Sequence, residues 1–343
     1  MASIITLAES GWVPDPLIRV GIRQLVKQRL REEQRQPAGT KAARTEALRD
    51  SAIALHTDLA NEQHYEVPTE FFQYVLGPRL KYSSCIYPND HATLAEAEIH
   101  TLQLYKDRLD VKAGDHVLDL GCGWGSFSLW LAEYNPNVQI TAVSNSATQR
   151  AYIESRIEEL ALSNLKVITA DVNQLRLPEA TYDKIISVEM FEHVRNYQAL
   201  MHKISLWLKP GGVLFTHIFC HKELIYPFEV EGESNWMGRY FFTGGLMPAA
   251  DTLLAFQDDL QLEQRWLHDG THYERTARGW LDNMDANAEA VVPALRQTYG
   301  DEDVACWQQR WRMFFMACEE MFAFDRGNQW QVAHYRFVKP ELV

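Results

Sequence analysis

The 343-residue sequence lacks the features that define several large protein classes. Its five cysteines are an odd number without a Cys-x-x-Cys pair, which favours reduced thiols in a cytoplasmic protein over a disulfide framework or a metal site. It contains no apolar run of about 18 residues, so we expect no transmembrane segment. Its first residues also lack the basic and apolar regions of a signal peptide.

Positive charge is scarce as well, because 33 Lys and Arg face 46 Asp and Glu, for a formal net charge of -13. This field would repel a phosphate backbone, so we expect no nucleic-acid partner. Aromatic side chains, in contrast, are plentiful, with 10 Trp, 14 Tyr and 15 Phe. They are compatible either with a large core or with an aromatic-lined pocket.

From residue 115 onward, apolar strands alternate with amphipathic helices, which is typical of a parallel sheet covered on both faces. Strands are expected at 116–121, 139–144, 165–171, 182–190 and 211–219, and intervening helices at 126–133, 147–160 and 197–208. Two later strands, at 260–268 and 330–339, flank a long helical region at 276–324. We therefore predict an α/β fold with a Rossmann-like doubly wound sheet, parallel apart from one antiparallel edge strand.

The strongest local signal is a glycine-rich turn between a buried strand and a helix, in VLDLGCGWGSFSLWLAE at 117–133. The turn contains Gly121, Gly123 and Gly125, and Asp119 lies two positions before the first glycine. Glycines permit the unusual backbone angles of such a turn and let a ligand approach the bare backbone. The GxGxG spacing resembles the first motif of class I methyltransferases and departs from the dinucleotide fingerprint.

This resemblance implies S-adenosylmethionine (SAM) as the cofactor and S-adenosylhomocysteine (SAH) as its product. SAM has no phosphate but carries an ammonium group, which Asp119 could hold; alternatively, Asp119 could bind the amides of its own turn. At the end of the second strand, Ser144, Asn145 and Gln149 are candidates for the ribose hydroxyls. Asp171 and Val172 follow the third strand and are candidates for the adenine, although Asp171 could be only a turn residue.

Further motifs resemble the cyclopropane fatty acid synthase superfamily, and within it the plant coclaurine N-methyltransferase group, which methylates alkaloid nitrogens. The resemblance covers 61–339 and rests on HYEVPTEFFQYVLGPRLKYSSCIYP (64–88), SVEMFEHV (187–194), WMGRYFFTGGLMP (236–248), HYERTARGWLDNMD (272–285) and GNQWQVAHYRFVK (327–339). It implies that Tyr82 and Ser83 close over the cofactor, although Tyr82 could be ordinary core. A homodimer is a further expectation for this group.

Two departures from the cyclopropane-forming enzymes point to an amine substrate. Those enzymes hold a bicarbonate ion with a Cys, a Glu, a His and a Tyr; the counterparts of the last three are Glu192, His217 and Tyr273, but Ser84 stands in the Cys position. In addition, Glu189 stands where the cyclopropane synthases tend to have a small residue and the coclaurine group has Glu.

The segment that follows the fourth strand suits methyl transfer to an amine. A carboxylate can anchor a protonated amine, and a nearby His can accept the proton that must leave before the nitrogen has a lone pair. Glu192 and His193 are the leading catalytic pair and Glu189 is a second anchor. Alternatively, the carboxylates could cap a helix and His193 could be structural. The substrate-binding candidates, which could also be core, are His217, Tyr240, Phe241, Tyr273 and Trp330.

The N-terminal region is expected to be helical, with a basic amphipathic helix that begins at Pro16, a linker at 32–42 and a second helix at 44–59. The basic helix could pack on its own protein or a dimer partner, or lie on a membrane surface. We divide the chain into an extension that closes over the cofactor (1–110), a SAM-binding core (111–221), a helical substrate lid with the sixth strand (222–329) and a final edge strand (330–343).

Three functions are compatible with these residues. The favoured one is a SAM-dependent N-methyltransferase acting on a small aromatic or heterocyclic amine. The alternative is a cyclopropane-synthase-type enzyme that modifies unsaturated acyl chains, which the basic helix would favour because anionic membranes attract such helices. The third is a protein that binds SAM without turnover, against which the cluster of Glu192, His193, His217 and Tyr273 argues.

Overall fold

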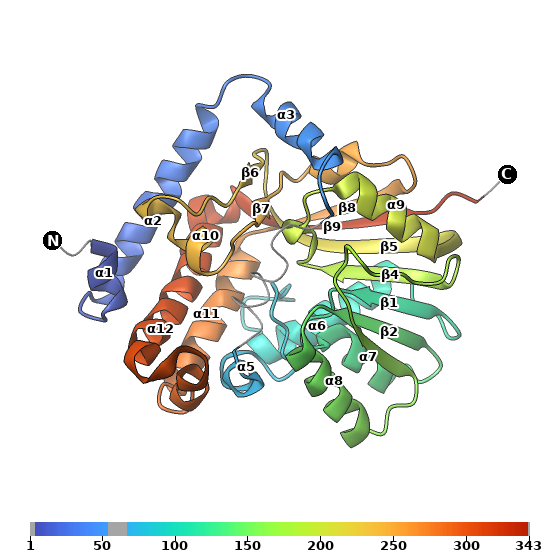
Figure 1. The fold of residues 1–343 in the computed structure, drawn as a ribbon, viewed down its shortest axis with the longest axis horizontal. Helices are drawn as coiled ribbons and strands as arrows, with labels where there is room; N and C mark the ends of the chain where they lie inside the picture. The colour runs from blue at the N-terminus through green and yellow to red at the C-terminus, as the bar shows by residue number, and fades with distance from the viewer. Residues whose placement is uncertain (1–3, 54–66, 342–343) are drawn as a thin grey trace.

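The computed structural model describes residues 4–53 and 67–341 and is organised around a seven-stranded sheet (Figure 1). The strand order is β3-β2-β1-β4-β5-β9-β8. The strands are β1 (His116–Leu120), β2 (Gln139–Ser144), β3 (Leu165–Thr169), β4 (Tyr182–Val188), β5 (Leu208–His221), β8 (Gln261–Asp269) and β9 (Trp330–Val338). Every strand expected from the sequence is present, which confirms the predicted Rossmann-like sheet.

The antiparallel part of the sheet differs in one detail from the prediction. Strands β1 to β5 pair in parallel, whereas β9 pairs antiparallel with β5 on one side and with β8 on the other. The strand that ends the chain was expected at the edge, but it lies between β5 and β8, and β8 forms the edge. The buried side chains of β9 explain this position, because an internal strand is covered on both faces.

Helices cover both faces of the sheet. On one face lie α6 (Leu94–Leu109), α7 (Ser126–Tyr134) and α8 (Ala147–Glu159), and on the other lies α9 (Tyr197–Trp207). Neighbouring residues of one strand serve opposite faces: Ile186 packs in the core beneath α6 and α7, and Ile185 in the core beneath α9. This alternation along buried strands produces their nearly continuous apolar sequences.

A helical layer extends from the sheet and has a core of its own (Figure 1). It comprises α5 (Thr69–Val75), α10 (Trp236–Tyr240), α11 (Thr271–Ala286) and α12 (Val292–Ala323), beside the short pair β6 (Tyr226–Pro227) and β7 (Leu246–Met247). Phe71 of α5 packs on Trp311 of α12 at 4.8 Å between ring centroids. Short 3-10 helices complete the described elements at Ala47–Arg49, Phe191–His193, Glu233–Asn235, Thr252–Ala255 and Phe324–Gly327.

The N-terminal segment forms α1 (Ile4–Glu9), α2 (Asp15–Gln34) and α3 (Thr40–Glu46). The basic side chains of α2 bind acidic residues of α12: Arg19 lies 2.8 Å from Glu319, and Arg23 lies 2.9 Å from Glu320. The helix therefore packs on its own protein, as one of the sequence alternatives predicted.

Two boundaries of this region differ from the prediction. The linker between α2 and α3 is shorter than the predicted 32–42, because α2 continues to Gln34 and α3 begins at Thr40. The second helix and its 3-10 extension end at Arg49, and residues 54–59 of the helix predicted at 44–59 lie outside the described residues. Within the described part of the chain, no helix has the length and apolarity needed to cross a membrane. The four-part division of the chain stays a prediction.

Candidate active site

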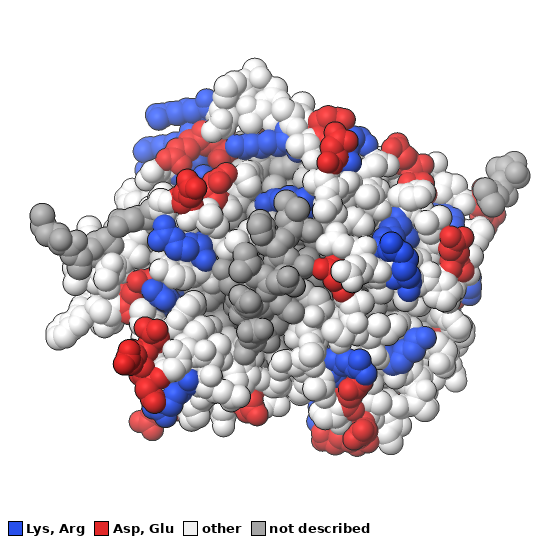
Figure 2. All heavy atoms as spheres, viewed as in Figure 1, with Lys and Arg blue, Asp and Glu red and all other residues white. Residues whose placement is uncertain are grey.

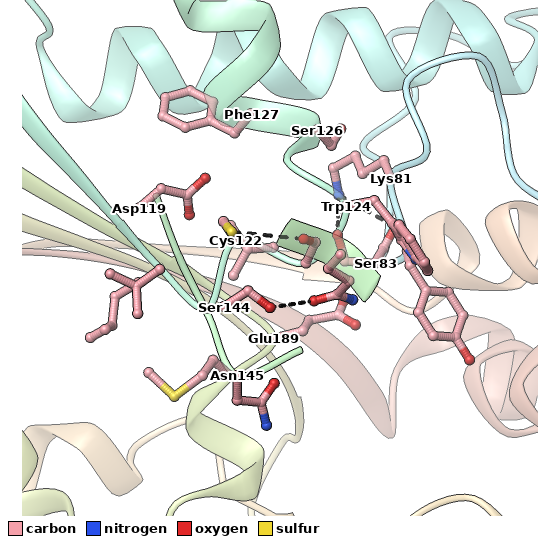
Figure 3. Close-up of a pocket in the computed structure, with 18 of the residues that line it drawn as sticks. Lys81, Ser83, Asp119, Cys122, Trp124, Ser126, Phe127, Ser144, Asn145 and Glu189 are labelled. Carbon is pink, nitrogen blue, oxygen red and sulfur yellow. Dashed lines mark hydrogen bonds between the residues drawn. The ribbon is translucent and has the colours of Figure 1, made fainter. Parts of the chain in front are cut away.

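A cavity with an empty volume of about 1240 Å³ opens where β1, β2 and β4 end (Figure 3). Parallel strands bring their carboxyl ends to one edge of a sheet, and doubly wound folds bind ligands there. The predicted residues that line it are Tyr82, Ser83, Asp119, Gly121, Gly123, Ser144, Asn145, Gln149, Asp171, Val172, Glu189 and His193. Most of the cofactor-binding candidates from the sequence therefore lie around one cavity, together with two of the three catalytic candidates.

The glycine turn has the geometry that its sequence requires. Gly121, Gly123 and Gly125 have φ of 81°, 53° and 74°, in the left-handed region that glycine adopts readily. A Cβ on Gly121 would lie only 2.8 Å from Cγ of Met190. Gly125 lies outside the cavity lining, beside Ile153 of α8, and lets α7 start close to that helix. The turn therefore presents backbone to the cavity and could not do so with side chains at these positions.

Asp119 faces the cavity from the end of β1 and is only 2% exposed. Its Oδ2 accepts a 2.6 Å hydrogen bond from Oγ of Ser128. Burial raises the pKa of Asp119 to about 7, and the Ser128 bond opposes this only in part. A cation beside the carboxylate would favour its ionised form. The position therefore fits the ammonium group of SAM better than a neutral ligand.

The end of β2 supplies polar atoms to the same cavity. Ser144 Oγ donates to Oε1 of Gln149 at 2.7 Å and accepts from the backbone N–H of Ser146 at 3.0 Å. Nε2 of Gln149, Nε1 of Trp124 and Oγ of Ser126 are buried without a hydrogen-bond partner among residues 4–53 and 67–341. All three residues line the cavity, so a ligand with hydroxyl and carboxylate groups would satisfy them. These residues fit a nucleoside cofactor.

Asp171 and Val172 also line the cavity, after β3. Oδ1 of Asp171 accepts a hydrogen bond from the backbone N–H of Asn173 at 2.6 Å. Asp171 therefore stabilises its own turn as well as facing the cavity, so both roles considered for it are compatible with the structure.

Glu189 follows β4 in a left-handed conformation with φ of 48°, which is uncommon for a residue other than glycine. Its carboxylate accepts from the backbone N–H of Ser84 at 2.8 Å, from Nε2 of His217 at 3.1 Å and from the hydroxyl of Tyr273 at 2.8 Å. Burial would raise the pKa of Glu189, but the bond to His217 and the charge of Lys81 bring it below its usual value. Glu189 is therefore an ionised carboxylate at the cavity wall.

His193 and Glu192, adjacent in sequence, have different environments. His193 lines the cavity and packs on Phe242, with ring centroids 4.6 Å apart, and burial lowers its pKa to about 4. Glu192 is fully buried and does not line the cavity; its Oε1 accepts from the backbone N–H of Phe219 at 2.7 Å. Burial and then the charge of Glu189 raise the pKa of Glu192 well above its usual value. Glu192 is therefore a neutral acid in this arrangement.

His217 and Tyr273 lie behind the carboxylate of Glu189 and contact it directly, but they do not line the cavity. His217 is fully buried, and burial lowers its pKa to about 4 even though Glu189 is its partner. Tyr273 also stacks on Phe322, with ring centroids 4.2 Å apart. Both residues were expected to contact the substrate, but in the structure they contact Glu189, which lines the cavity, and do not line it themselves.

The other aromatic candidates lie away from this cavity. Phe241 is fully buried and stacks on Phe314 at 4.4 Å, and the hydroxyl of Tyr240 accepts from Arg310 at 3.3 Å. Trp330 donates to the hydroxyl of Tyr226 at 2.8 Å and lines a second, apolar cavity between α2 and the helical layer. Their assignment to the substrate stays a prediction.

Sequence reasoning missed Lys81, a buried cation that lines the cavity (Figure 3). Its Nζ donates to Oγ of Ser83 at 2.7 Å and to the backbone carbonyl of Ser84 at 2.5 Å. It thereby holds the loop whose Ser84 N–H binds Glu189. A single lysine in a loop carries no sequence signal of its own, although it adjoins the Tyr82-Ser83 pair.

A doubly wound sheet in which an acidic residue precedes a GxGxG turn at the ligand-binding edge is typical of a SAM-dependent methyltransferase. Comparison with known proteins agrees. The model of the mycolic acid cyclopropane synthetase family matches residues 55–332, and the chain belongs to this family. The membership expected from the sequence motifs is thus confirmed, together with the SAM cofactor.

The relatives include N-methyltransferases over the full length of the chain. It is 37% identical to (S)-coclaurine N-methyltransferase of Thalictrum flavum subsp. glaucum, covering 99% of this chain and 96% of that one. The enzyme of the same name from Papaver somniferum is 36% identical, with 96% of each chain covered. A solved structure of coclaurine N-methyltransferase bound to N-methylheliamine and SAH has a TM-score of 0.93 at 35% identity, covering 98% of this chain and 99% of that one.

Proposed function

We propose that this enzyme transfers the methyl group of SAM to the nitrogen of a small aromatic or heterocyclic amine. The observation that carries the proposal is the Glu189 carboxylate, which lies at the wall of the cofactor cavity and accepts three hydrogen bonds. A protonated amine needs such an anion beside the cofactor, whereas an alkene has no charge to anchor. The coclaurine N-methyltransferases among the relatives support the same class of substrate.

SAM, when bound, supplies a methyl group on a sulfonium sulfur. Asp119 would hold its ammonium group, and the polar side chains Ser144, Asn145 and Gln149 would hold its ribose. Asp171 and Val172 would flank the adenine, and the loop of Tyr82 and Ser83 would cover the cofactor. The main task of the protein is to place a lone pair in line with the methyl carbon, which lowers the barrier through orientation.

Glu189 and His193 would share the handling of the amine. Glu189 anchors the ammonium form, and its three hydrogen-bond donors fix the carboxylate in one orientation. Burial keeps the imidazole of His193 neutral near pH 7, but a pKa of about 4 also makes it a weak base for the proton that the amine must lose. Its expected role as the proton acceptor therefore stays a prediction. The expected catalytic role of Glu192 stays a prediction, because its carboxyl group contacts the backbone of Phe219.

The contacts of Glu189 also argue against the lipid alternative. The family resemblance implies that cyclopropane-forming enzymes hold bicarbonate with residues at the positions of Ser84, His217 and Tyr273. In this chain the same three residues donate to the Glu189 carboxylate. The Glu189 carboxylate therefore takes up the donors that a bicarbonate ion would need. This arrangement fits the binding of an ammonium group better than the binding of bicarbonate.

The direct test measures SAH release with a panel of aromatic and heterocyclic amines, beside unsaturated phospholipid vesicles with added bicarbonate. Turnover with amines, lost in Glu189→Gln, is the expected result. Turnover only with the vesicles would contradict the proposal and favour the lipid alternative. SAH binding without turnover on either panel would favour a protein that only binds the cofactor.

The remaining expectations belong to the same proposal. Figure 2 shows Lys and Arg side chains interspersed with Asp and Glu side chains on the face drawn, which suits a small-molecule partner better than a nucleic acid. A homodimer and a cytoplasmic location are likewise proposed, and sedimentation and cell fractionation would test them.

A further inference from the structure

Behind Glu189, a line of hydrogen bonds runs along one face of the sheet, from β5 to β9, and ends at an arginine of α6. Nε2 of His217 binds Glu189, and Nδ1 of His217 lies 2.9 Å from Nε2 of His334. Nδ1 of His334 in turn contacts Nη1 of Arg108. We call these four residues the Arg108 network. They come from the loop after β4, from β5, from β9 and from α6, so their positions in sequence are far apart.

The chemistry of arginine sets the direction of every bond in this network. A guanidinium has only donors, so Nδ1 of His334 must be an unprotonated acceptor. Burial lowers the pKa of His334 well below its usual value, so the ring is neutral and its single proton is on Nε2. That N–H donates to Nδ1 of His217, which places the proton of His217 on Nε2, facing Glu189. The donor-only Arg108 at one end of the network and the acceptor-only Glu189 carboxylate at the other thus require the same two tautomers.

The network is held in place by its surroundings. His217 and His334 are register partners on β5 and β9, and both are fully buried. The guanidinium of Arg108 lies 4.4 Å from the ring centre of Trp266, and its Nη1 also donates to Nε2 of His268 at 3.0 Å. Burial lowers the pKa of Arg108 to about 10, which leaves it charged near neutral pH.

Two other polar groups face His217. The hydroxyl of Tyr105 lies 2.6 Å from Nδ1 of His217 and can donate to the same acceptor as His334. The ammonium of Lys81 lies 5.3 Å from the ring centre of Tyr105. The hydroxyl of Tyr105 can also rotate and accept, so Tyr105 alone does not decide the tautomer of His217. Arg108, which can only donate, and the Glu189 carboxylate, which can only accept, are the two members of the Arg108 network that cannot reverse their roles.

We propose that Arg108 is a positioning residue that fixes the tautomer of His334, so that the N–H of His334 holds the His217 ring whose own N–H orients the Glu189 carboxylate toward the amine. The tautomer assignment stands on the hydrogen-bond geometry alone, and its effect on the amine rests on the proposed function. In many functional sites a carboxylate or carbonyl fixes the tautomer of a histidine by accepting from one ring nitrogen. Here Arg108 would fix the tautomer by donating to a ring nitrogen.

The test uses full-length protein labelled with 15N and 13C in histidine and saturated with SAH. Two-bond proton–nitrogen spectra report which ring nitrogen carries the proton, and His217→Gln and His334→Gln assign the signals. Wild-type protein should show both histidines protonated on Nε2. In Arg108→Met, His334 should populate the Nδ1-protonated form, while His217, whose Nε2 still faces the Glu189 carboxylate, should keep its tautomer. Arg108→Lys, which keeps a donor, should retain the wild-type pattern at both histidines.

Arg49→Met is a matched control, because Arg49 also packs on an aromatic ring, 4.8 Å from the centre of Phe256, and lies outside the site. It should leave the tautomers unchanged. Arg108→Met should raise the KM for an amine substrate about tenfold, as the loss of one bond to a charged group does. Its affinity for SAH should stay near wild type. In Arg49→Met, both the KM and the SAH affinity should stay near wild type. Rescue of KM by Arg108→Lys would separate this role from a structural one.

A His334 ring that stays protonated on Nε2 in Arg108→Met would overturn the proposal. If that variant does not accumulate as folded protein, Arg108→Leu replaces it, because leucine also offers no donor to His334. An unchanged His334 tautomer in Arg108→Leu would overturn the proposal equally. A wild-type enzyme that methylates no amine would refute the proposed function, and the tautomer spectra would still decide the role of Arg108.

Discussion

Replacing Asp119 by Asn is expected to weaken cofactor binding and to remove its dependence on pH. Burial raises the pKa of Asp119 to about 7 in the free protein. The ammonium group of SAM or SAH favours the ionised carboxylate, so binding releases a proton whenever Asp119 is protonated beforehand. Affinity should therefore rise with pH up to about 7 and then level off.

The size of the effect follows from the ionised fraction. With a pKa of about 7, roughly nine tenths of Asp119 is ionised one pH unit above this value and roughly one tenth one unit below it. The dissociation constant for SAH should therefore increase about tenfold for each pH unit below 7. In Asp119→Asn the charge-assisted contact is lost at every pH, which should weaken binding roughly 10- to 100-fold.

Isothermal titration calorimetry with SAH, at constant ionic strength and between about pH 5.5 and 8.5, measures the dissociation constant and its dependence on pH. Ser128→Ala is a matched control, because its hydroxyl donates to Asp119 and lowers the pKa. The midpoint should move to higher pH in that variant, and the curve should keep its shape. A flat profile in the wild type, or a sloping one in Asp119→Asn, would refute the assignment of Asp119 to the ammonium group.

Three further substitutions test the site. Glu189→Gln should raise the amine KM by about 10- to 100-fold, from the loss of an anion, with SAH affinity unchanged in the same titrations. Glu192→Gln keeps an acceptor for the Phe219 N–H and should retain most turnover. Glu192→Ala loses this acceptor and should lower the free energy of unfolding, measured in urea, by about 1–3 kcal/mol. A large loss of turnover in Glu192→Gln would show that Glu192 acts in the reaction. Gly121→Ala should abolish SAH binding, because its Cβ meets Met190 in a left-handed backbone, and normal binding would contradict this.

The cofactor half of the site was predictable because its determinants are local. A buried strand, an acidic residue, closely spaced glycines and a helix are consecutive in the chain, and the turn between them needs glycine for backbone reasons that no distant contact changes. The structure places Asp119, Gly121 and Gly123 at the cavity as expected. The order of the strands was less accessible, because strand pairing between β9 and β8 depends on contacts between distant segments.

The substrate half depended on the tertiary structure. Glu189, Glu192 and His193 lie within five residues, and the left-handed backbone at Glu189 and the 3-10 helix after it place Glu189 and His193 at the cavity and Glu192 away from it.

The residues that hold Glu189 were still less accessible, because Ser84, His217 and Tyr273 approach it from a loop, a strand and a helix. Arg108 reaches the same site through a strand that ends the chain. Local backbone requirements are present in the sequence itself, whereas burial, and with it the charge state of each carboxylate, arises only when distant segments pack together.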